Sequence, residues 1–379
     1  MALQIAASNL LHEEFLQDTP QFYWKHPDGT KGRPVGIDHE LDPVHLGHST
    51  QNLLAYSNKS RVLQIELVMA NGEGDRVAAK IMKSKLDVEK LRNELEILQS
   101  LRHKHVAAVL GSFCSHTRQK KPEYGILVFP LATQNLQDFL EEISEHNKEH
   151  KERGLAWNPH VNAHKLLPYF ACLCVTVLYL HEQRQPIKHR DIKPANILID
   201  RVDNVILADF DISKVYEHRN EAITYGSLDG TVMYSSKDVW KNCARDDPEG
   251  SKRGLEWDVV SLGFVFLEMA TVLFGKDLKK MRTDYGETKE PGRVIYSEAL
   301  AKGQIHNWLD DLRETAESNT WKAPPTLVAV TKLEPDYVKK FLQAIEDMMS
   351  AEQNDDQPLK GARMTFGRFS AHCPNPKSE

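Results

Sequence analysis

The sequence of 379 residues has neither an excess of basic residues nor a long uninterrupted apolar run. Lysine and arginine number 48 against 54 acidic residues, which gives a formal net charge of −6. Proteins that bind nucleic acid or a membrane surface through general charge are basic, so we expect neither partner. The longest apolar stretches, around 168–180 and 262–275, fall short of the roughly 20 residues that a membrane span needs. We expect two buried helices there.

Cysteine is scarce and irregularly spaced, with five residues in the whole chain. An odd number without a repeated spacing predicts no disulfide framework and favours an intracellular location, in the cytoplasm or nucleus. The first residues, MALQIAASNLLHEEF, lack the basic start and the apolar core of a secretion signal. Cys172 and Cys174 lie in an apolar run, where core packing explains them better than metal binding.

Strand patterns dominate the first third of the chain, and helix patterns follow. Two apolar segments, 62–70 and 76–82, flank the turn sequence NGEGD at 71–75, which predicts a hairpin. Within 84–101 apolar residues recur at three- and four-residue steps, as on one face of a helix. Further strands are expected at 106–113, 124–130, 196–200 and 205–208, and further helices at 135–147, 163–183, 255–273, 297–316 and 335–350. The order predicts an α+β protein.

One eight-residue segment, HRDIKPAN at 189–196, carries the most specific signal. The segment resembles the catalytic loop of the eukaryotic protein kinase superfamily, H-R-D-x-x-x-x-N. Phosphoryl transfer to a hydroxyl needs a carboxylate that accepts or orients the proton, and an amide oxygen that reaches magnesium. In this loop Asp191 and Asn196 would supply the two groups. This resemblance implies that Asp191 is the base, Asn196 a metal ligand, and Lys193 the charge-stabilising lysine of the serine/threonine type.

The resemblance covers about residues 46–366 and implies a bilobal fold. A small β-rich N-lobe with one main helix would span about 46–132, and a larger helical C-lobe about 133–366. We expect residues 1–45 to be an extension with little regular structure, and 367–379 to be a flexible tail.

Two further motifs match the nucleotide-binding half of that family. The sequence ADFD at 208–211 stands where the family has D-F-G, which implies that Asp209 binds magnesium. The sequence VAAK at 77–80 resembles V-A-I-K, so Lys80 would pair with the α and β phosphates. Glu94 is expected to hold Lys80 in place, and a surface ion pair between Lys90 and Glu94 is the alternative.

Glycine is missing where the family uses it to cover the phosphates. The three glycine positions of G-x-G-x-x-G fall on Ala55, Ser57 and Ser60, and Asp211 replaces the glycine of D-F-G. Glycine lets the backbone approach phosphates and adopt angles that other residues resist. We therefore expect weaker nucleotide binding and altered mobility of the loop around Asp211, with the chemistry retained.

The resemblance assigns further residues to the nucleotide site. Phe129 would close the back of the adenine pocket, and the backbone of Pro130 and Ala132 would bind the adenine edge. The other expected nucleotide contacts are Ser57, Ser60, Val62, Ala78, Asn135 and Leu198.

An activation segment is expected at about 209–238. It contains GTVMY at 230–234, in which Thr231 would line the acceptor site. Three residues are candidates for phosphorylation: Thr224, Tyr225 and Ser227. Arg190 would either dock such a phosphate or pair with a carboxylate, and both readings stay open.

Two acidic residues would have structural roles in this family. Asp258, in WDVVSLG at 257–263, would brace the backbone of the catalytic loop. Asp238 is the acid kept from A-P-E, and it would pair with Arg363.

The resemblance implies transfer of the γ-phosphoryl group of ATP, with Mg²⁺, to serine or threonine hydroxyls of protein substrates. A pseudokinase that serves as a scaffold or allosteric partner is the first alternative, favoured by the missing glycines and Asp211. A kinase-fold enzyme that acts on a small molecule is the second, and Lys193 argues against it. A regulatory partner would bind at 1–45 or 276–330, although a solvated helical surface also explains 276–330.

Overall fold

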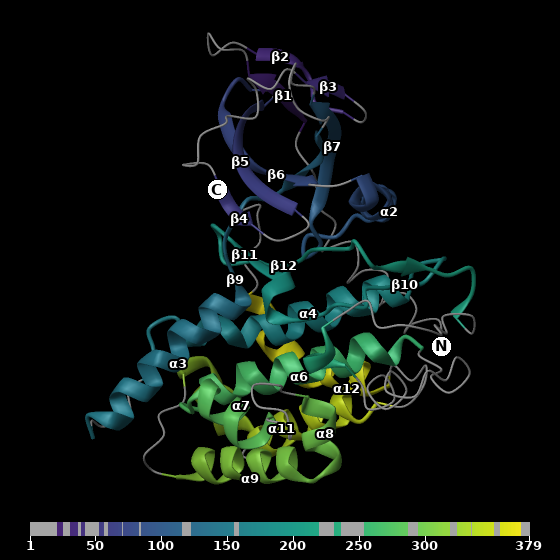
Figure 1. Ribbon diagram of the computed structural model, residues 1–379. Coiled ribbons are helices and arrows are strands. Elements are labelled where there is room, and N and C mark those ends of the chain that lie inside the picture. Colours follow the sequence, from purple (N-terminus) through teal and green to yellow (C-terminus); the bar gives the residue numbers. More distant parts are fainter. Residues whose placement is uncertain are drawn as a thin grey trace. The chain divides into compact units, whose positions relative to one another are not determined.

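The computed structural model describes residues 21–25, 31–36, 39–41, 53–56, 60–69, 71–82, 85–115, 123–154, 159–219, 231–235, 254–286, 295–318, 324–334, 336–351 and 357–372. The chain divides into two compact units. Unit 1 comprises residues 1–133 and 206–213, and unit 2 comprises 134–205 and 214–379. Unit 1 is built mainly from strands and unit 2 mainly from helices, which is the expected α+β fold (Figure 1).

The sheet of unit 1 is built on a long hairpin. Its strands β5 (Ser60–Met69) and β6 (Gly74–Met82) are joined by a turn in which Gly72 has a φ of 87°. Strands β8 (Glu123–Phe129) and β7 (Ala108–Ser115) follow β6 in the sheet, and β4 (Leu53–Tyr56) pairs with β5. Helix α2 (Lys85–Ser100) turns Leu91, Ile97 and Leu98 inward. These elements lie within a few residues of their predicted positions.

Three short strands precede this hairpin and belong to the same sheet. They are β1 (Phe22–Lys25), β2 (Lys31–Pro34) and β3 (His39–Leu41). The sheet order is β2-β1-β5-β6-β8-β7-β3, so strands from the N-terminal segment form both ends of this path. The expectation that residues 1–45 have little regular structure is therefore wrong for the described part. A strand of four residues is too short for periodicity to reveal, and its partner β5 lies far along the sequence.

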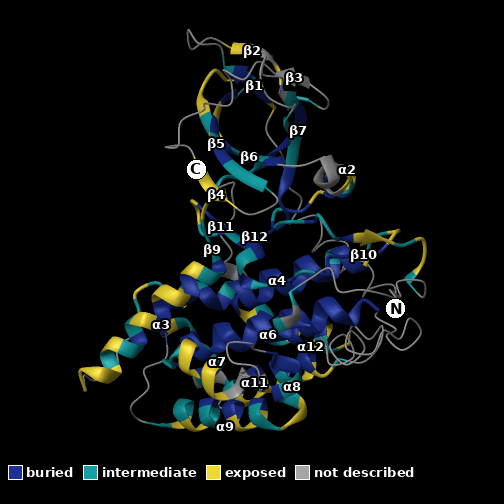
Figure 2. Ribbon diagram, viewed as in Figure 1, coloured by how far each residue is buried: buried dark blue, intermediate teal, exposed yellow. Residues whose placement is uncertain are grey.

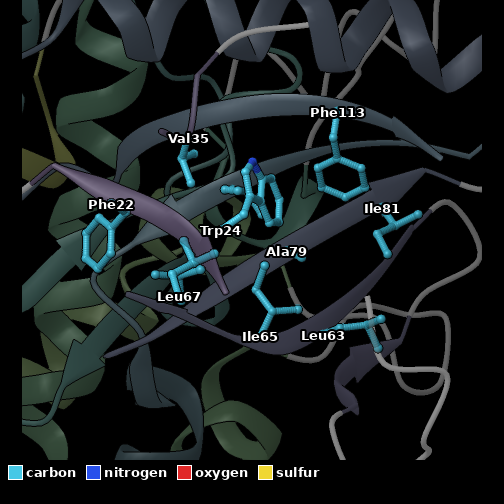
Figure 3. Packing of buried hydrophobic residues seen from close by; sticks show 11 residues of the cluster. Phe22, Trp24, Val35, Leu63, Ile65, Leu67, Ala79, Ile81 and Phe113 are labelled. Carbon is cyan, nitrogen blue, oxygen red and sulfur yellow. The ribbon is translucent and has the colours of Figure 1, made fainter. Parts of the chain in front are cut away.

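The N-terminal strands are held by the main hydrophobic cluster of unit 1 (Figure 3). Phe22, Trp24 and Val35 are buried, and Phe22 lies 5.4 Å from Phe129 between ring centroids. A Cβ atom at Gly111 would come within 2.2 Å of the carbonyl oxygen of Gly36, so the close approach of these segments requires glycine there. The cluster consists of Phe22, Trp24, Val35, Leu63, Ile65, Leu67, Val77, Ala79, Ile81, Phe113 and Leu127.

Unit 2 is organised around helix α6 (Glu256–Leu273), which is buried along its whole length (Figure 2). Its other helices are α3 (Leu136–Glu152), α4 (Leu166–His181), α7 (Leu278–Gly286), α8 (Tyr296–Ala301), α9 (Gln304–Glu317), α10 (Pro325–Leu333), α11 (Tyr337–Met349) and α12 (Gln357–Phe366). Short 3-10 helices lie at Ala163–Lys165, Pro194–Asn196, Val232–Tyr234 and Gly367–His372. Its short strands are β10 (Ile187–Lys188), β11 (Ile197–Asp200) and β13 (Lys214–Val215). Two more short strands, β9 (Ala132–Asn135) and β12 (Val205–Leu207), each contain residues of both units.

Two predicted segments of unit 2 differ from the structure. The helix expected at 297–316 is two helices, because Gly303 takes a left-handed φ of 76° between α8 and α9. The tail expected from 367 onward starts with the 3-10 helix Gly367–His372. Phe369 is buried there and packs on Tyr337, with ring centroids 5.8 Å apart. Burial of this aromatic ring anchors the segment Gly367–His372 to helix α11.

The apolar helix α4 is a core element. Within the described ranges, the stretch Ala163–His181 is apolar and long enough to cross a membrane, and 78 % of the tested window is buried inside the fold. Cys172 and Cys174 are both buried in it, as expected for core packing. Cys172 is disulfide-bonded, however, while Cys114 and Cys174 are free thiols. The sequence pattern did not indicate this bond, because spacing along a sequence does not show which cysteines a fold brings together.

The packing of β1 predicts that the N-terminal strands stabilise the chain. Phe22→Ala empties a buried ring position, and we expect a loss of about 3–5 kcal/mol in the free energy of unfolding, measured by denaturant titration. Lys25→Ala, in the same strand, removes a half-exposed ion pair with Glu66 and should cost less than about 1 kcal/mol. Equal, small losses for both variants would show that β1 does not contribute to the folded core.

Candidate active site

The first group of predicted site residues lies in unit 1 and is centred on Lys80. The Lys80 ammonium on β6 donates to Glu94 Oε2 and to Asp209 Oδ1, both at 2.6 Å. Helix α2 brings Glu94 inward on the side of Leu91 and Leu98, and the Glu94 side chain is only 3 % exposed. The expected Lys80–Glu94 pair is thus present in the structure. The alternative of a surface pair with Lys90 is wrong, because Glu94 is buried.

Burial and charge act against each other in this group. Burial on its own would lower the pKa of Lys80, but the negative charges of Glu94 and Asp209 more than offset it, and the pKa lies above its usual value. Lys80 is therefore a permanent cation at neutral pH. Burial raises the pKa of Glu94, Lys80 lowers it, and the charges of Asp209 and Asp211 raise it, so that the net shift is upward.

Strand register places several predicted nucleotide contacts on one face of the sheet. Residues directly opposite each other in an antiparallel pair point to the same side. Val62 lies opposite Lys80, and Ala78 lies opposite Val128. Since Ala78 and Lys80 are two residues apart on one strand, all four side chains share the face that carries the Lys80 ammonium. Contact of Val62 and Ala78 with a nucleotide stays a prediction.

The same register corrects the interpretation of Phe129. Phe129 packs against the hydrophobic cluster on the opposite face, beside Phe22, and does not share the face of Lys80. Val128, and not Phe129, lies on the face of Lys80, directly opposite Ala78. The alternation of side chains along a strand could have shown this. Leu127 and Phe129 are two residues apart and share the face of the buried cluster, whereas Val128 lies between them and points to the other face.

The backbone around Asp209 also differs from expectation. Because Asp211 replaces a glycine of the family, backbone angles that favour glycine were expected at this position. In the described residues the positive φ in this segment belongs to Asp209, at 68°, and Asp211 has none. Asp211 therefore meets no backbone penalty here, and its consequence is electrostatic, through the pKa of Glu94.

The second group lies in unit 2 and is centred on Asp191. Oδ1 of Asp191 accepts hydrogen bonds from the backbone N–H of Thr231 at 3.0 Å and from its hydroxyl at 2.8 Å. Oδ2 accepts from Lys193 Nζ at 2.7 Å and from Asn196 Nδ2 at 3.0 Å. Lys193 Nζ also donates to the Thr231 hydroxyl at 2.8 Å. The structure thus brings Thr231, from the separate segment GTVMY, together with three residues of HRDIKPAN.

A buried carboxylate holds the catalytic loop in this shape. Asp258 on α6 accepts from the backbone N–H groups of His189 at 2.7 Å and Arg190 at 2.8 Å, and lies 3.2 Å from His181 Nε2. Burial alone would raise the pKa of Asp258, but His181 and the backbone donors together lower it, so the group stays ionised. Arg190 has a left-handed φ of 72°, which these bonds support. The bracing predicted for Asp258 is confirmed.

The remaining predicted residues are placed as follows. Ser60 begins β5, Pro130 follows β8, Ala132 begins β9 and Leu198 lies half-buried in β11. Asn135 caps helix α3, where its Oδ1 accepts from the backbone N–H of Asp138 at 2.9 Å. The residues Ser57, Thr224, Tyr225, Ser227 and Asp238 lie outside the described residues.

Oxygen atoms that could act as magnesium ligands are present in both the Lys80 group and the Asp191 group. Asn196 Nδ2 donates to the backbone oxygen of Asp191 at 2.9 Å and to its carboxylate, which leaves the amide oxygen to act as an acceptor. The carboxylate of Asp209 is 38 % exposed beside Lys80. Magnesium prefers such oxygen ligands and keeps several waters, so the donor chemistry fits the ion. Over the ranges given above, no three of His, Cys, Asp and Glu converge as a metal-binding group.

Comparison with known proteins agrees with these two groups. The model of the protein kinase domain matches residues 62–332. The chain therefore belongs to the protein kinase family.

Curated relatives carry serine/threonine kinase names. A putative G-type lectin S-receptor-like serine/threonine-protein kinase of Arabidopsis thaliana is 26 % identical over 65 % of this chain and 26 % of its own length. Serine/threonine-protein kinase Nek10 of Homo sapiens is 27 % identical over 60 % of this chain and 17 % of its own length. A probable serine/threonine-protein kinase, WNK6 of Oryza sativa subsp. japonica, is 27 % identical over 68 % of this chain and 51 % of its own length. The chain thus spans about half or less of the length of these relatives.

The position of Asp258 leads to a prediction about stability. Asp258→Asn keeps the size of the side chain but replaces the charged acceptor of two backbone donors, and we expect a loss of about 3 kcal/mol in the free energy of unfolding. The control, Asp284→Asn on α7, changes an exposed residue and should cost less than about 1 kcal/mol. Denaturant titration of both variants measures the difference, and an unchanged midpoint for Asp258→Asn would contradict the bracing role.

Proposed function

We propose that the chain is an active serine/threonine protein kinase, which transfers the γ-phosphoryl group of ATP to hydroxyls of protein substrates with Mg²⁺ as cofactor. The observation that carries this proposal is the set of hydrogen bonds around Asp191. One carboxylate oxygen of Asp191 accepts from the hydroxyl of Thr231 at 2.8 Å, and the ammonium of Lys193 lies 2.8 Å from the oxygen of that same Thr231 hydroxyl. A carboxylate paired with a cation at one hydroxyl is the arrangement that phosphoryl transfer to an alcohol needs.

Asp191 has two tasks in the proposed reaction. It orients the attacking hydroxyl of the substrate and takes its proton as the oxygen bonds to phosphorus and the bond to the leaving ADP oxygen breaks. Thr231, which donates to Asp191 through both its N–H and its hydroxyl, holds the carboxylate in one orientation. Lys193 offsets the negative charge that develops on the transferred group.

Lys80 supplies the corresponding function for the nucleotide. Its ammonium is held between Glu94 and Asp209 and stays charged, so it is suited to bind phosphate oxygens. Asp209 and Asn196 would hold magnesium, which neutralises the phosphates when it is bound. Pairing by Glu94 limits the positions that the flexible Lys80 side chain can adopt, and this reduces the entropy lost on binding.

The pseudokinase alternative rests on the missing glycines at Ala55, Ser57 and Ser60 and on Asp211. The Asp211 carboxylate adds a negative charge near Glu94 and Asp209, where phosphates have to bind. Against this alternative, Lys80, Glu94, Asp191, Asn196 and Asp209 are all retained, and a scaffold has no chemical need for the whole set. Protein substrates are favoured over small molecules by the contact between Lys193 and Thr231.

Substitution of the base tests the catalytic role. Asp191→Asn retains hydrogen bonding but cannot accept a proton, so we expect turnover to fall by a factor of about 10² or more. Phosphate incorporation into a mixture of serine- and threonine-containing peptides measures turnover, and circular dichroism confirms folding. A folded Asp191→Asn variant that works as fast as the wild type would disprove the assignment.

The nucleotide site has its own matched test on helix α2. Glu94→Gln removes the charge that holds Lys80, and we expect the affinity for Mg²⁺–ATP to fall by about tenfold. Glu96→Gln makes the same chemical change at an exposed position of the same helix and should leave affinity within about twofold. Isothermal titration calorimetry measures the affinity of both variants and of the wild type for Mg²⁺–ATP. Equal affinities for the two variants would show that Glu94 does not organise nucleotide binding.

A further inference from the structure

Glu268, a residue outside the groups described so far, is the most heavily bonded buried carboxylate of helix α6. Its side chain is fully buried, and it accepts hydrogen bonds from three different elements. The Tyr234 hydroxyl donates to Oε1 at 3.1 Å, and the Tyr296 hydroxyl donates to the same oxygen. Arg282 makes a bidentate ion pair with Glu268, in which Nε donates to Oε1 at 2.9 Å and Nη2 donates to Oε2 at 2.8 Å.

The donors to Glu268 differ in what they connect. Tyr234 belongs to the 3-10 helix Val232–Tyr234, three residues after Thr231. Arg282 belongs to α7 and Tyr296 to α8, both in the charged stretch 276–330 that the catalytic groups do not use. The carboxylate therefore joins this stretch to the segment that carries Thr231.

A short path of hydrogen bonds leads from Tyr234 to the proposed base. The Tyr234 backbone N–H lies 3.4 Å from the carbonyl oxygen of Thr231, and Ser261 on α6 donates to the Tyr234 carbonyl at 2.9 Å. Thr231 in turn donates twice to Asp191. The segment 231–235 is thus fastened to α6 at its far end and to Asp191 at its near end.

Arg282 pairs with both oxygens of the buried Glu268 carboxylate and so offsets the cost of its burial. A buried carboxylate without a cation is costly and tends to take up a proton. Burial and the Glu268 charge raise the pKa values of Tyr234 and Tyr296, so both phenols remain protonated donors. The charge of Glu268 strengthens both of these hydrogen bonds.

We propose that Arg282, acting through Glu268 and Tyr234, is a positioning residue that holds Thr231 against Asp191 at the acceptor side of the reaction. This inference rests on the proposed kinase function. On this proposal, helix α7 has a role in the enzyme, because it supplies the positive charge of Arg282 that holds the segment 231–235 in place through Glu268. Nucleotide binding should not depend on it, because no member of this network belongs to the Lys80 group.

Two matched variants test the proposal. Tyr234→Phe and Tyr296→Phe each remove one hydroxyl from the same oxygen of Glu268, but only Tyr234 is part of the segment 231–235. With the serine/threonine peptide mixture as acceptor, we expect kcat/KM for the peptides to fall about tenfold in Tyr234→Phe and by less than about twofold in Tyr296→Phe. The KM for ATP should stay within about twofold in both.

Arg282→Gln should behave like Tyr234→Phe, and the double variant should lose little more than either, because both act through one carboxylate. If Arg282→Gln does not fold, the two tyrosine variants still decide. Hydrogen exchange of residues 231–235 gives a readout that needs no activity, and it should be faster in Tyr234→Phe than in Tyr296→Phe.

Equal kinetics and equal exchange in the two tyrosine variants would overturn the positioning role. A wild-type chain that transfers no phosphate would instead refute the proposed function, and the exchange comparison would still decide whether Glu268 holds the segment.

Discussion

The buried carboxylate of Asp258 is the constraint on which the candidate active site depends. It accepts from two successive backbone N–H groups, those of His189 and Arg190, and thereby stabilises a left-handed residue immediately before Asp191. Because Asp258 lies on α6, the position of the catalytic loop is tied to a helix that is buried along its whole length. Asp191, Lys193 and Asn196 all follow within that loop, so their mutual distances derive from this one anchor.

A second carboxylate of the same helix extends this principle to the acceptor side. Asp258 and Glu268 both come from α6, and both are fully buried and surrounded by donors. One holds the backbone before Asp191, and the other holds the segment that returns to Asp191 through Thr231. Such buried charges are costly unless every oxygen is bonded, which makes them poor sources of stability and good means of specifying one geometry. In unit 1 the buried carboxylate of Glu94 is likewise paired with a cation, the ammonium of Lys80.

The chemistry-bearing residues could be predicted because their motifs are local. HRDIKPAN, VAAK and DFD each lie within a few consecutive residues, and the long amphipathic helices and the β5–β6 hairpin have clear periodicity. What escaped prediction depends on partners far away in the chain. Phe22 and Tyr23 pair with Met69 and Val68 of β5, and Phe369 packs against the distant ring of Tyr337. The exchange of Phe129 and Val128 came from a one-residue error in register, which reverses the face of a strand.

The central claim is that this member of the protein kinase family is catalytically active towards serine and threonine. It is tested most directly by incubating the wild-type chain with Mg²⁺–ATP and an equimolar mixture of peptides that differ only in carrying serine, threonine or tyrosine, followed by mass spectrometry. The account predicts phosphate on the serine and threonine peptides and none on the tyrosine peptide. Nucleotide binding without any phosphopeptide, or phosphate on tyrosine alone, would contradict it.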